Sequence, residues 1–429
     1  MNNIKKCRSI YQMSMRTFTP AGTLKAAEKL LPYVAELGFE YVYILPVTEA
    51  DRDTDVNTWS WKKECIDNPA CPYKLVDFFN IDKEYGTNDD FKSFINSAHK
   101  YGLKIIIDLV YLHCGRNIYH LAEDRDFLIR DENGNIPIAE RWPFARINFN
   151  NQRAREYLWE NMIYFIKDCN ADGFRCDSGD WVPIDFWEEG IKRVKAINPD
   201  VLMINEGYNR DSLNYGFDMI YTDNDMITEP NSYYLITGKI SVAEWKNRMS
   251  EEFAKSGKFI RFAENHDLAS TAGVARLERV LGTDKFEAYI ALCYTLNGVP
   301  FIWNGNEFCD TSVNKIMGNR EYGHNSLNWM NAQTKKGKRR IELIKTLNKM
   351  RKEYPELQIA GTEMLSSSEN VIAFRRQLKE GILTAVFNLG KECYKTELSG
   401  NIIFSNYADS AQGKLKVEPN GYCIMKNID

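Results

Sequence analysis

The stretch Gly173-Phe174-Arg175-Cys176-Asp177 is the most informative feature of the chain, because it places a carboxylate two residues after an arginine at the end of a short apolar run. A positive charge this close favours the ionised form of the carboxylate, and a carboxylate nucleophile must be ionised. Paired arginine and aspartate side chains also occur in structural roles, so the motif alone indicates catalysis only weakly. The sequence around it has to decide between the two interpretations.

Three further segments have the same form, an apolar run that leads into polar residues. They are 105–113 with Asp108 and His113, 201–206 with Glu206, and 259–267 with His266 and Asp267. Each pattern predicts a buried strand with polar side chains at its carboxyl end. Asp177 and Glu206 are 29 residues apart and Glu206 and Asp267 are 61 apart, about one and two strand-helix units of roughly 30 residues. Because the strands of a parallel barrel all end on one face, these side chains are expected to converge there.

The hydrophobic pattern extends this arrangement over the chain. Strands are predicted at 9–15, 40–47 and 103–110, in segments that end at 177 and 205, and at 217–221, 258–262 and 299–303; helical repeats lie at 24–34, 89–101, 153–168, 185–197 and 341–350. After residue 356, short strands at 370–376, 382–387 and 421–425 are separated by turn residues. We therefore predict an α/β protein: a (β/α)8 TIM barrel formed by 1–113 and 151–355, a small inserted domain after strand 3 at 114–150, and a C-terminal antiparallel β-sandwich domain at 356–429.

Composition excludes several classes of partner. The net charge is -4 and the 27% of charged residues mix both signs, so neither nucleic acid nor a membrane surface is an expected partner. Apolar runs are shorter than the roughly 20 residues that span a bilayer, and the first ten residues lack an apolar signal core, which predicts a cytoplasmic protein. The ten cysteines form no CxxC pair and favour reduced, buried thiols; only Cys65 and Cys71 are a plausible disulfide.

The four polar segments resemble the four signature regions of the alpha-amylase family, glycoside hydrolase family 13. Further matches to the family, in the expected order, lie at Tyr11-Gln12, Tyr85-Gly86-Thr87 with Asp90-Phe91, and Gly298-Val299-Pro300-Phe301 with Gly305 and Glu307. The resemblance covers nearly the whole chain. It implies a retaining alpha-glycosidase in which Asp177 is the nucleophile, Glu206 the acid/base and Asp267 the carboxylate that stabilises the transition state.

The same resemblance implies a set of substrate-binding residues: Tyr73, Asp108, His113, Arg175, His266 and Trp181. Tyr73 is expected to stack on a sugar face, and the histidines to hydrogen-bond sugar hydroxyls. For Asp108 a structural role, in which it orients Arg175, stays open as an alternative. Trp59, Trp61 and Trp142 lie in loops expected at the same barrel face.

Some positions depart from the family pattern. Leu112 stands where many members have an asparagine that binds calcium, and the acidic loop 51–57 lacks the glycine and distal glutamate of a calcium hand, so no metal is expected. No cofactor is expected either. Ser178, Trp181 and Gly207 differ from the usual residues near the leaving group, which leaves linkage and chain length open.

The predicted function is hydrolysis of alpha-glucosidic bonds in short alpha-glucan oligosaccharides, with no prediction for oligomeric state. Two alternatives remain. A transglycosylase would use the same site and pass the sugar to another sugar hydroxyl instead of water. A non-catalytic carbohydrate-binding or scaffold relative is the other, although the presence of Asp177, Glu206 and Asp267 together argues against it.

Overall fold

The computed structural model describes residues 7–55, 70–137, 143–221, 231–253, 258–270, 276–312, 316, 326–411 and 413–427. Four residues named in the sequence predictions lie outside these ranges: Trp59, Trp61, Cys65 and Trp142. The proposed pairing of Cys65 with Cys71 and the three loop tryptophans are therefore untested.

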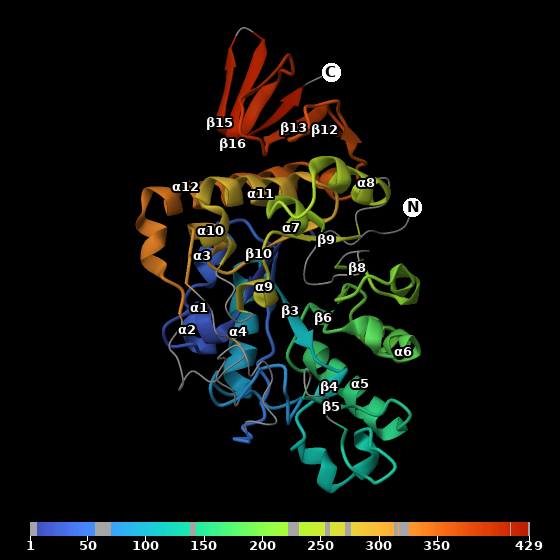
Figure 1. Ribbon diagram of the computed structural model, residues 1–429. Coiled ribbons are helices and arrows are strands. Elements are labelled where there is room, and N and C mark those ends of the chain that lie inside the picture. The colour runs from blue at the N-terminus through green and yellow to red at the C-terminus, as the bar shows by residue number, and fades with distance from the viewer. Residues whose placement is uncertain are drawn as a thin grey trace.

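Eight parallel strands form the centre of the molecule (Figure 1): β1 (Ile10–Met13), β2 (Tyr41–Ile44), β3 (Lys104–Leu109), β6 (Gly173–Cys176), β7 (Leu202–Asn205), β8 (Met219–Ile220), β9 (Ile260–Phe262) and β10 (Val299–Trp303). Their order is β8-β7-β6-β3-β2-β1-β10-β9, and a parallel bridge between Ile220 and Phe259 joins the two ends. The predicted (β/α)8 barrel is thus confirmed, with every strand inside its predicted segment.

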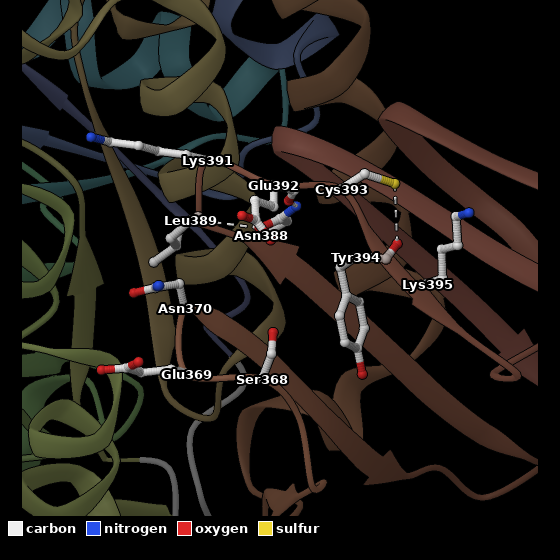
Figure 2. A pocket seen from close by; sticks show the side chains of 11 residues that line it. Ser368, Glu369, Asn370, Asn388, Leu389, Lys391, Glu392, Cys393, Tyr394 and Lys395 are labelled. Carbon is white, nitrogen blue, oxygen red and sulfur yellow. Dashed lines mark hydrogen bonds between the residues drawn. The ribbon is translucent and has the colours of Figure 1, made fainter.

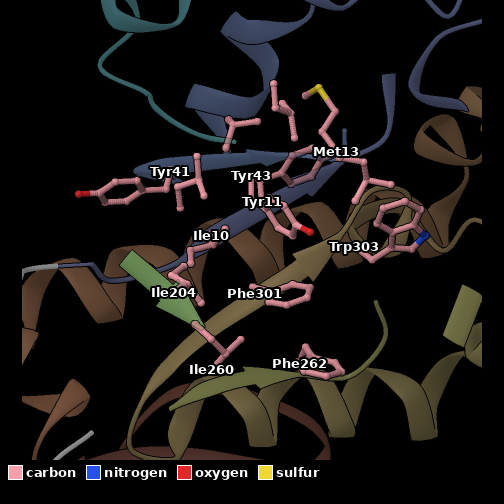
Figure 3. Close-up of a cluster of buried hydrophobic side chains, with 14 of the residues drawn as sticks. Ile10, Tyr11, Met13, Tyr41, Tyr43, Ile204, Ile260, Phe262, Phe301 and Trp303 are labelled. Atoms are coloured by element: carbon pink, nitrogen blue, oxygen red, sulfur yellow. The ribbon is translucent and has the colours of Figure 1, made fainter. Parts of the chain in front are cut away.

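The strands are buried along nearly their whole length because helices cover one face and the barrel interior the other, so both faces need apolar side chains. Figure 3 shows residues of one such cluster, in which Phe262 and Phe301 stack with ring centroids 4.9 Å apart. Tyr221 packs against the same pair, 5.6 Å from the ring of Phe262. Burial of each large side chain stabilises the barrel by about 1.5–3 kcal/mol.

The helices are α1 (Met15–Phe18), α2 (Leu24–Glu28), α3 (Leu31–Glu36), α4 (Asn88–Lys100), α5 (Gln152–Lys167), α6 (Ile184–Ile197), α7 (Asn231–Ile236), α8 (Val242–Phe253), α9 (His266–Ser270), α10 (Leu277–Leu281), α11 (Thr283–Thr295) and α12 (Lys335–Glu353). Thr87 and Asp90 form a capping box that fixes the start of α4. The single helix predicted over 24–34 is wrong. It is divided into α2 and α3 because Pro32, which has no N–H and crowds the preceding turn, lies in the first turn of α3.

In the described part of the segment after β3, β4 (His113–Cys114) and β5 (Ala145–Arg146) form a short antiparallel pair, and an isolated antiparallel bridge joins Leu128 and Ile147. Between these strands the described residues form the single-turn elements η3 (Tyr119–Ala122) and η4 (Arg125–Phe127). This irregular segment fits an inserted domain, and we propose the limits 114–150 for it.

The C-terminal strands are β11 (Glu363–Met364), β12 (Val371–Gln377), β13 (Ile382–Asn388), β14 (Tyr394–Thr396), β15 (Asn401–Ala411) and β16 (Lys414–Asn427). They form one hydrogen-bonded antiparallel sheet that packs on α11 and α12 (Figure 1). Alternate residues serve opposite faces: Ile372 and Phe374 join the main core, whereas Val371 and Ala373 join a second apolar cluster. The predicted antiparallel C-terminal domain is present, and we propose that it begins near residue 356.

A hollow of about 520 Å³ opens in this C-terminal sheet, lined by residues 368–370 and 388–395. Figure 2 shows that Tyr394 and Asn370 border it. All of its lining comes from the C-terminal domain, so it is separate from the polar strand ends of the barrel. Within the described residues, no helix combines the length and the apolar character needed to cross a membrane.

Candidate active site

Arg175 connects three of the predicted acidic residues. It lies on β6 with only 1% of its side chain exposed, and its Nη1 donates to Asp108 Oδ1 at 2.7 Å and to Asp177 Oδ1 at 2.8 Å. Its Nη2 forms an ion pair with Glu206 Oε1. Because Asp108, Arg175 and Glu206 belong to β3, β6 and the end of β7, which are neighbours in the sheet, the predicted convergence of these side chains is present.

Asp108 is held by hydrogen bonds from several directions. Besides Arg175, the hydroxyl of Tyr43 on β2 donates to Asp108 Oδ2 at 2.6 Å and that of Tyr73 donates to the same oxygen at 2.8 Å. Three donors surround a carboxylate that is 5% exposed. This geometry favours the interpretation that Asp108 orients Arg175 and Tyr73.

His266 continues this network. Tyr73 OH lies 2.7 Å from His266 Nε2 and Gln12 Nε2 lies 2.9 Å from His266 Nδ1. Since Tyr73 gives its only proton to Asp108, His266 Nε2 must carry a proton, and Nδ1 accepts from the Gln12 amide. Burial lowers the pKa of His266 to about 3, which keeps this imidazole neutral. The Tyr73 and His266 rings also stack, 5.3 Å apart and inclined by 11°.

The two central carboxyl groups differ in their environments. Burial raises the pKa of Glu206 well above its usual value; Arg175 opposes this, whereas the charges of Asp177 and Asp267 raise the pKa further. Burial also raises the pKa of Asp177, and the charge and hydrogen bond of Arg175 oppose it. Arg175 therefore favours an ionised Asp177 as expected from the sequence, but burial is the larger effect.

The remaining predicted residues occupy different depths. Asp267 lies in the first turn of α9, half-buried, with its Oδ1 3.5 Å from His266 Nε2. His113 is buried on β4 against the ring of Phe144, 4.3 Å away, and burial lowers its pKa to about 3. Trp181 ends the turn η5 (Gly179–Trp181) and is 62% exposed. It is therefore available for a stacking contact.

Sequence reasoning missed some residues of this network. Tyr43 and Gln12 contact Asp108 and His266, and Tyr221 OH accepts a hydrogen bond from Arg175 Nε at 3.3 Å. A signal was present, since a tyrosine or glutamine inside an apolar strand needs a buried hydrogen-bond partner. The identity of the partner follows only from strand register, which places Tyr43 beside Ile106, two residues before its partner Asp108.

No metal site is indicated by the residues that the structure describes, among which no group of three or more His, Cys, Asp or Glu side chains could hold an ion. Asp51, in the acidic loop, instead accepts hydrogen bonds from Asn117 Nδ2 and the backbone N–H of Asp53. Residues 56 and 57 of that loop lie outside the described ranges.

The structure thus has a closed parallel barrel with a cluster of carboxyl groups at the carboxyl ends of its strands. The family model described as the alpha-amylase catalytic domain matches residues 8–135. Through this match and the relatives described next, the chain is similar to the alpha-amylase family, glycoside hydrolase family 13.

Two curated relatives and one solved structure illustrate the similarity. Alpha-amylase 2 of Dictyoglomus thermophilum is 24% identical over 95% of this chain and 71% of its own length. The intracellular maltogenic amylase of Bacillus subtilis is 22% identical over 86% of this chain, which spans 62% of that relative. The crystal structure of the maltogenic alpha-amylase AmyB of Thermotoga neapolitana matches with a TM-score of 0.79 and 22% identity, covering 100% of both chains. At this identity the solved structure supports the fold alone.

Proposed function

We propose that this protein is a retaining alpha-glycosidase that hydrolyses alpha-glucosidic bonds in short alpha-glucan oligosaccharides. The observation that carries the proposal is the Arg175 guanidinium, which contacts Asp177 and Glu206 at the same time. Retaining hydrolysis needs a nucleophile and an acid/base on carboxyl groups about 5–5.5 Å apart. A shared arginine keeps two such groups side by side.

Asp177 serves as the nucleophile. Arg175 holds Oδ1 of Asp177 and leaves its buried Oδ2 outside this contact. The lone pair of Oδ2 attacks the anomeric carbon as the bond from that carbon to the leaving oxygen breaks. The product is a glycosyl ester of Asp177, and the positive charge of Arg175 stabilises the carboxylate before attack.

Glu206 serves first as acid and then as base. Burial raises the pKa of Glu206 and so favours its protonated form, from which it gives its proton to the leaving oxygen. Esterification removes the negative charge of Asp177, which had raised the pKa of Glu206. Glu206 therefore stays ionised in the intermediate and can accept a proton from water. That water attacks the anomeric carbon and releases a sugar of retained configuration.

The other residues bind and orient the sugar in this proposal. Asp267 stabilises the positive charge that develops on the ring, and Tyr73 offers a stacking face beside His266. Both nitrogens of His266 already have protein partners, so a sugar hydroxyl would have to replace Tyr73 or Gln12. Trp181 is assigned to the leaving-group side because it closes the turn that follows Asp177.

The substrate class and cellular location rest on relatives. The maltogenic names of two relatives support short alpha-glucans as substrates, and the word intracellular in one supports a cytoplasmic location. Transglycosylation is the second candidate. The exposed ring of Trp181 favours it, since a sugar stacked there would compete with water for the glycosyl intermediate.

Product analysis tests the proposal. Maltotriose is incubated with enzyme, and proton NMR of fresh products should show the alpha anomer first. A beta anomer appearing first would refute the nucleophilic role of Asp177. Longer oligosaccharides formed alongside glucose and maltose would identify the transglycosylase instead.

A further inference from the structure

Two loops at the mouth of the barrel are joined through one carboxylate. Asp180 lies in η5, the turn after β6, and its Oδ2 accepts the backbone N–H groups of Tyr208 at 2.7 Å and Asn209 at 2.9 Å. Its Oδ1 accepts from Asn205 Nδ2 at 2.7 Å. A side chain of the β6 loop therefore satisfies three donors in the segment that carries Glu206.

Two glycines allow this close approach. A Cβ on Gly207 would lie 2.2–2.5 Å from the carboxyl atoms of Asp180, and a Cβ on Gly179 would lie 2.2 Å from Asn205 Oδ1. Cβ contacts this short do not occur in folded proteins, so any other residue would displace the Asp180 carboxyl group or the Asn205 amide. Gly207, which departs from the family pattern, is thus explained by the presence of Asp180.

The same loop also holds the side chain of Glu206. Ser178, with a left-handed backbone (φ 46°), donates its N–H to Glu206 Oε2 at 2.7 Å. Ser178 therefore fixes the carboxyl group, while Asp180, two residues later, fixes the backbone that follows Glu206. Both ends of the acid/base residue are tied to the loop of the nucleophile.

We propose that Asp180 is a positioning residue that, through the backbone of residues 207–209, holds Glu206 at the place where it can protonate the leaving group. This proposal rests on the proposed function and assigns Asp180 a role in one of its steps, leaving-group protonation. Asp180 itself contacts neither the reacting atoms nor the nucleophile. Its loss should therefore harm reactions in proportion to their need for a proton.

The test compares two substrates in Asp180→Ala. Maltotriose has a poor leaving group that needs the proton, whereas a 2,4-dinitrophenyl alpha-maltoside leaves without it. We expect kcat/KM for maltotriose, which reports the glycosylation step, to fall at least about tenfold more than kcat/KM for the aryl maltoside. An equal loss on the two substrates would overturn the positioning role.

Asp172→Ala is the matched control. Asp172 precedes β6, at the opposite end of the strand; its Oδ2 accepts the backbone N–H of Ile105 at 2.8 Å and also lies 2.7 Å from His99 Nε2. The Asp172→Ala variant therefore loses the same kind of carboxylate-to-backbone contact, but at a place distant from Glu206. Any change in this variant should affect both substrates equally.

Gly207→Ala disturbs the same contact from the other side; if Asp180→Ala fails to fold, the two-substrate comparison in Gly207→Ala alone tests the proposal. The added methyl group should cause the same selective loss in the wild-type background. It should cause little further loss beside Asp180→Ala, because the carboxylate it strikes is gone. Losses that simply multiply in the double variant would contradict the proposal.

Hydrogen exchange separates the two proposals. The amide hydrogens of Tyr208 and Asn209 should exchange at least about tenfold faster in Asp180→Ala than in wild type. Their exchange rates in Asp172→Ala should equal those in wild type. Unchanged exchange in Asp180→Ala would refute the loop contact even in an active enzyme. If the wild-type protein has no glycosidase activity but these two amides still exchange faster in Asp180→Ala, the proposed function is refuted and the loop contact stands.

Discussion

Replacing Glu307 should remove a pH-dependent weakness of the barrel. Glu307 lies in η7 (Asn306–Phe308) after β10, is 0% exposed, and accepts hydrogen bonds from Tyr11 OH at 2.7 Å and Gly305 N–H at 2.8 Å. Burial raises its pKa from the usual 4.5 to about 7 despite these donors. The folded protein therefore holds a proton that the unfolded chain releases.

The direction of the change in stability with pH follows from the difference between the folded and unfolded pKa values of Glu307. Between about pH 4.5 and pH 7 the folded state binds more protons than the unfolded state, so stability falls as pH rises through that window. A pKa raised from 4.5 to about 7 lowers the free energy of unfolding at pH 8 by about 3 kcal/mol relative to a neutral residue at this position. Glu307→Gln keeps the shape, accepts from Gly305 and donates to Tyr11, and so avoids this loss.

Urea unfolding at pH 5 and pH 8 measures the effect. The free energy of unfolding of Glu307→Gln relative to wild type should increase by about 2.5 kcal/mol between the two pH values. Tyr11→Phe removes a donor to the carboxylate, so the pKa of Glu307 should rise further and the falling window extend above pH 7. If wild type and Glu307→Gln keep a constant difference from pH 5 to pH 8, the reasoning is wrong.

Three further predictions concern the active site. Asp177→Ala and Glu206→Gln should each lower kcat on maltotriose by about 10³-fold or more without loss of the folded circular dichroism spectrum; near-normal rates in either variant would overturn the role assigned to it. Trp181→Ala should raise KM for maltotriose about tenfold more than KM for an aryl maltoside whose leaving group is not a sugar, because an exposed ring contributes binding rather than chemistry; equal changes in KM would remove Trp181 from the leaving-group side. Chelator treatment should leave activity and Tm nearly unchanged, since Leu112 offers no oxygen ligand; a loss that added calcium restores would contradict this.

Much of the barrel could be predicted because its signals are local. Buried parallel strands are apolar throughout, and polar residues such as Asp108 and Glu206 mark the points where these runs lead into the site. Pro32 also indicated the break between α2 and α3, but the prediction of one helix over 24–34 relied on the apolar repeat. The β15 strand was missed because most of its residues are exposed or half-buried, so it lacks the alternation that indicates a strand.

The candidate site was predictable as a set of residue types and not as a set of contacts. Asp177 and Arg175 are two residues apart, so their pairing could be expected from the sequence. By contrast, Asp180 is 28 residues from Tyr208, and no local pattern links a loop carboxylate to a particular backbone N–H. Contacts of this kind depend on how two neighbouring strands are aligned.

Closure of the barrel has a consequence for synthesis of the protein. Ile10 of β1 pairs with Phe301 of β10, 291 residues later in the chain. At about 5–20 residues per second a ribosome needs roughly 15–60 s to deliver the second strand after the first. During that interval one edge of β1, an entirely buried strand in the finished protein, waits without its partner. The growing chain therefore exposes, for much of its synthesis, an unpaired strand edge that can pair with other chains. A chaperone that covers short apolar segments should raise the yield of folded enzyme.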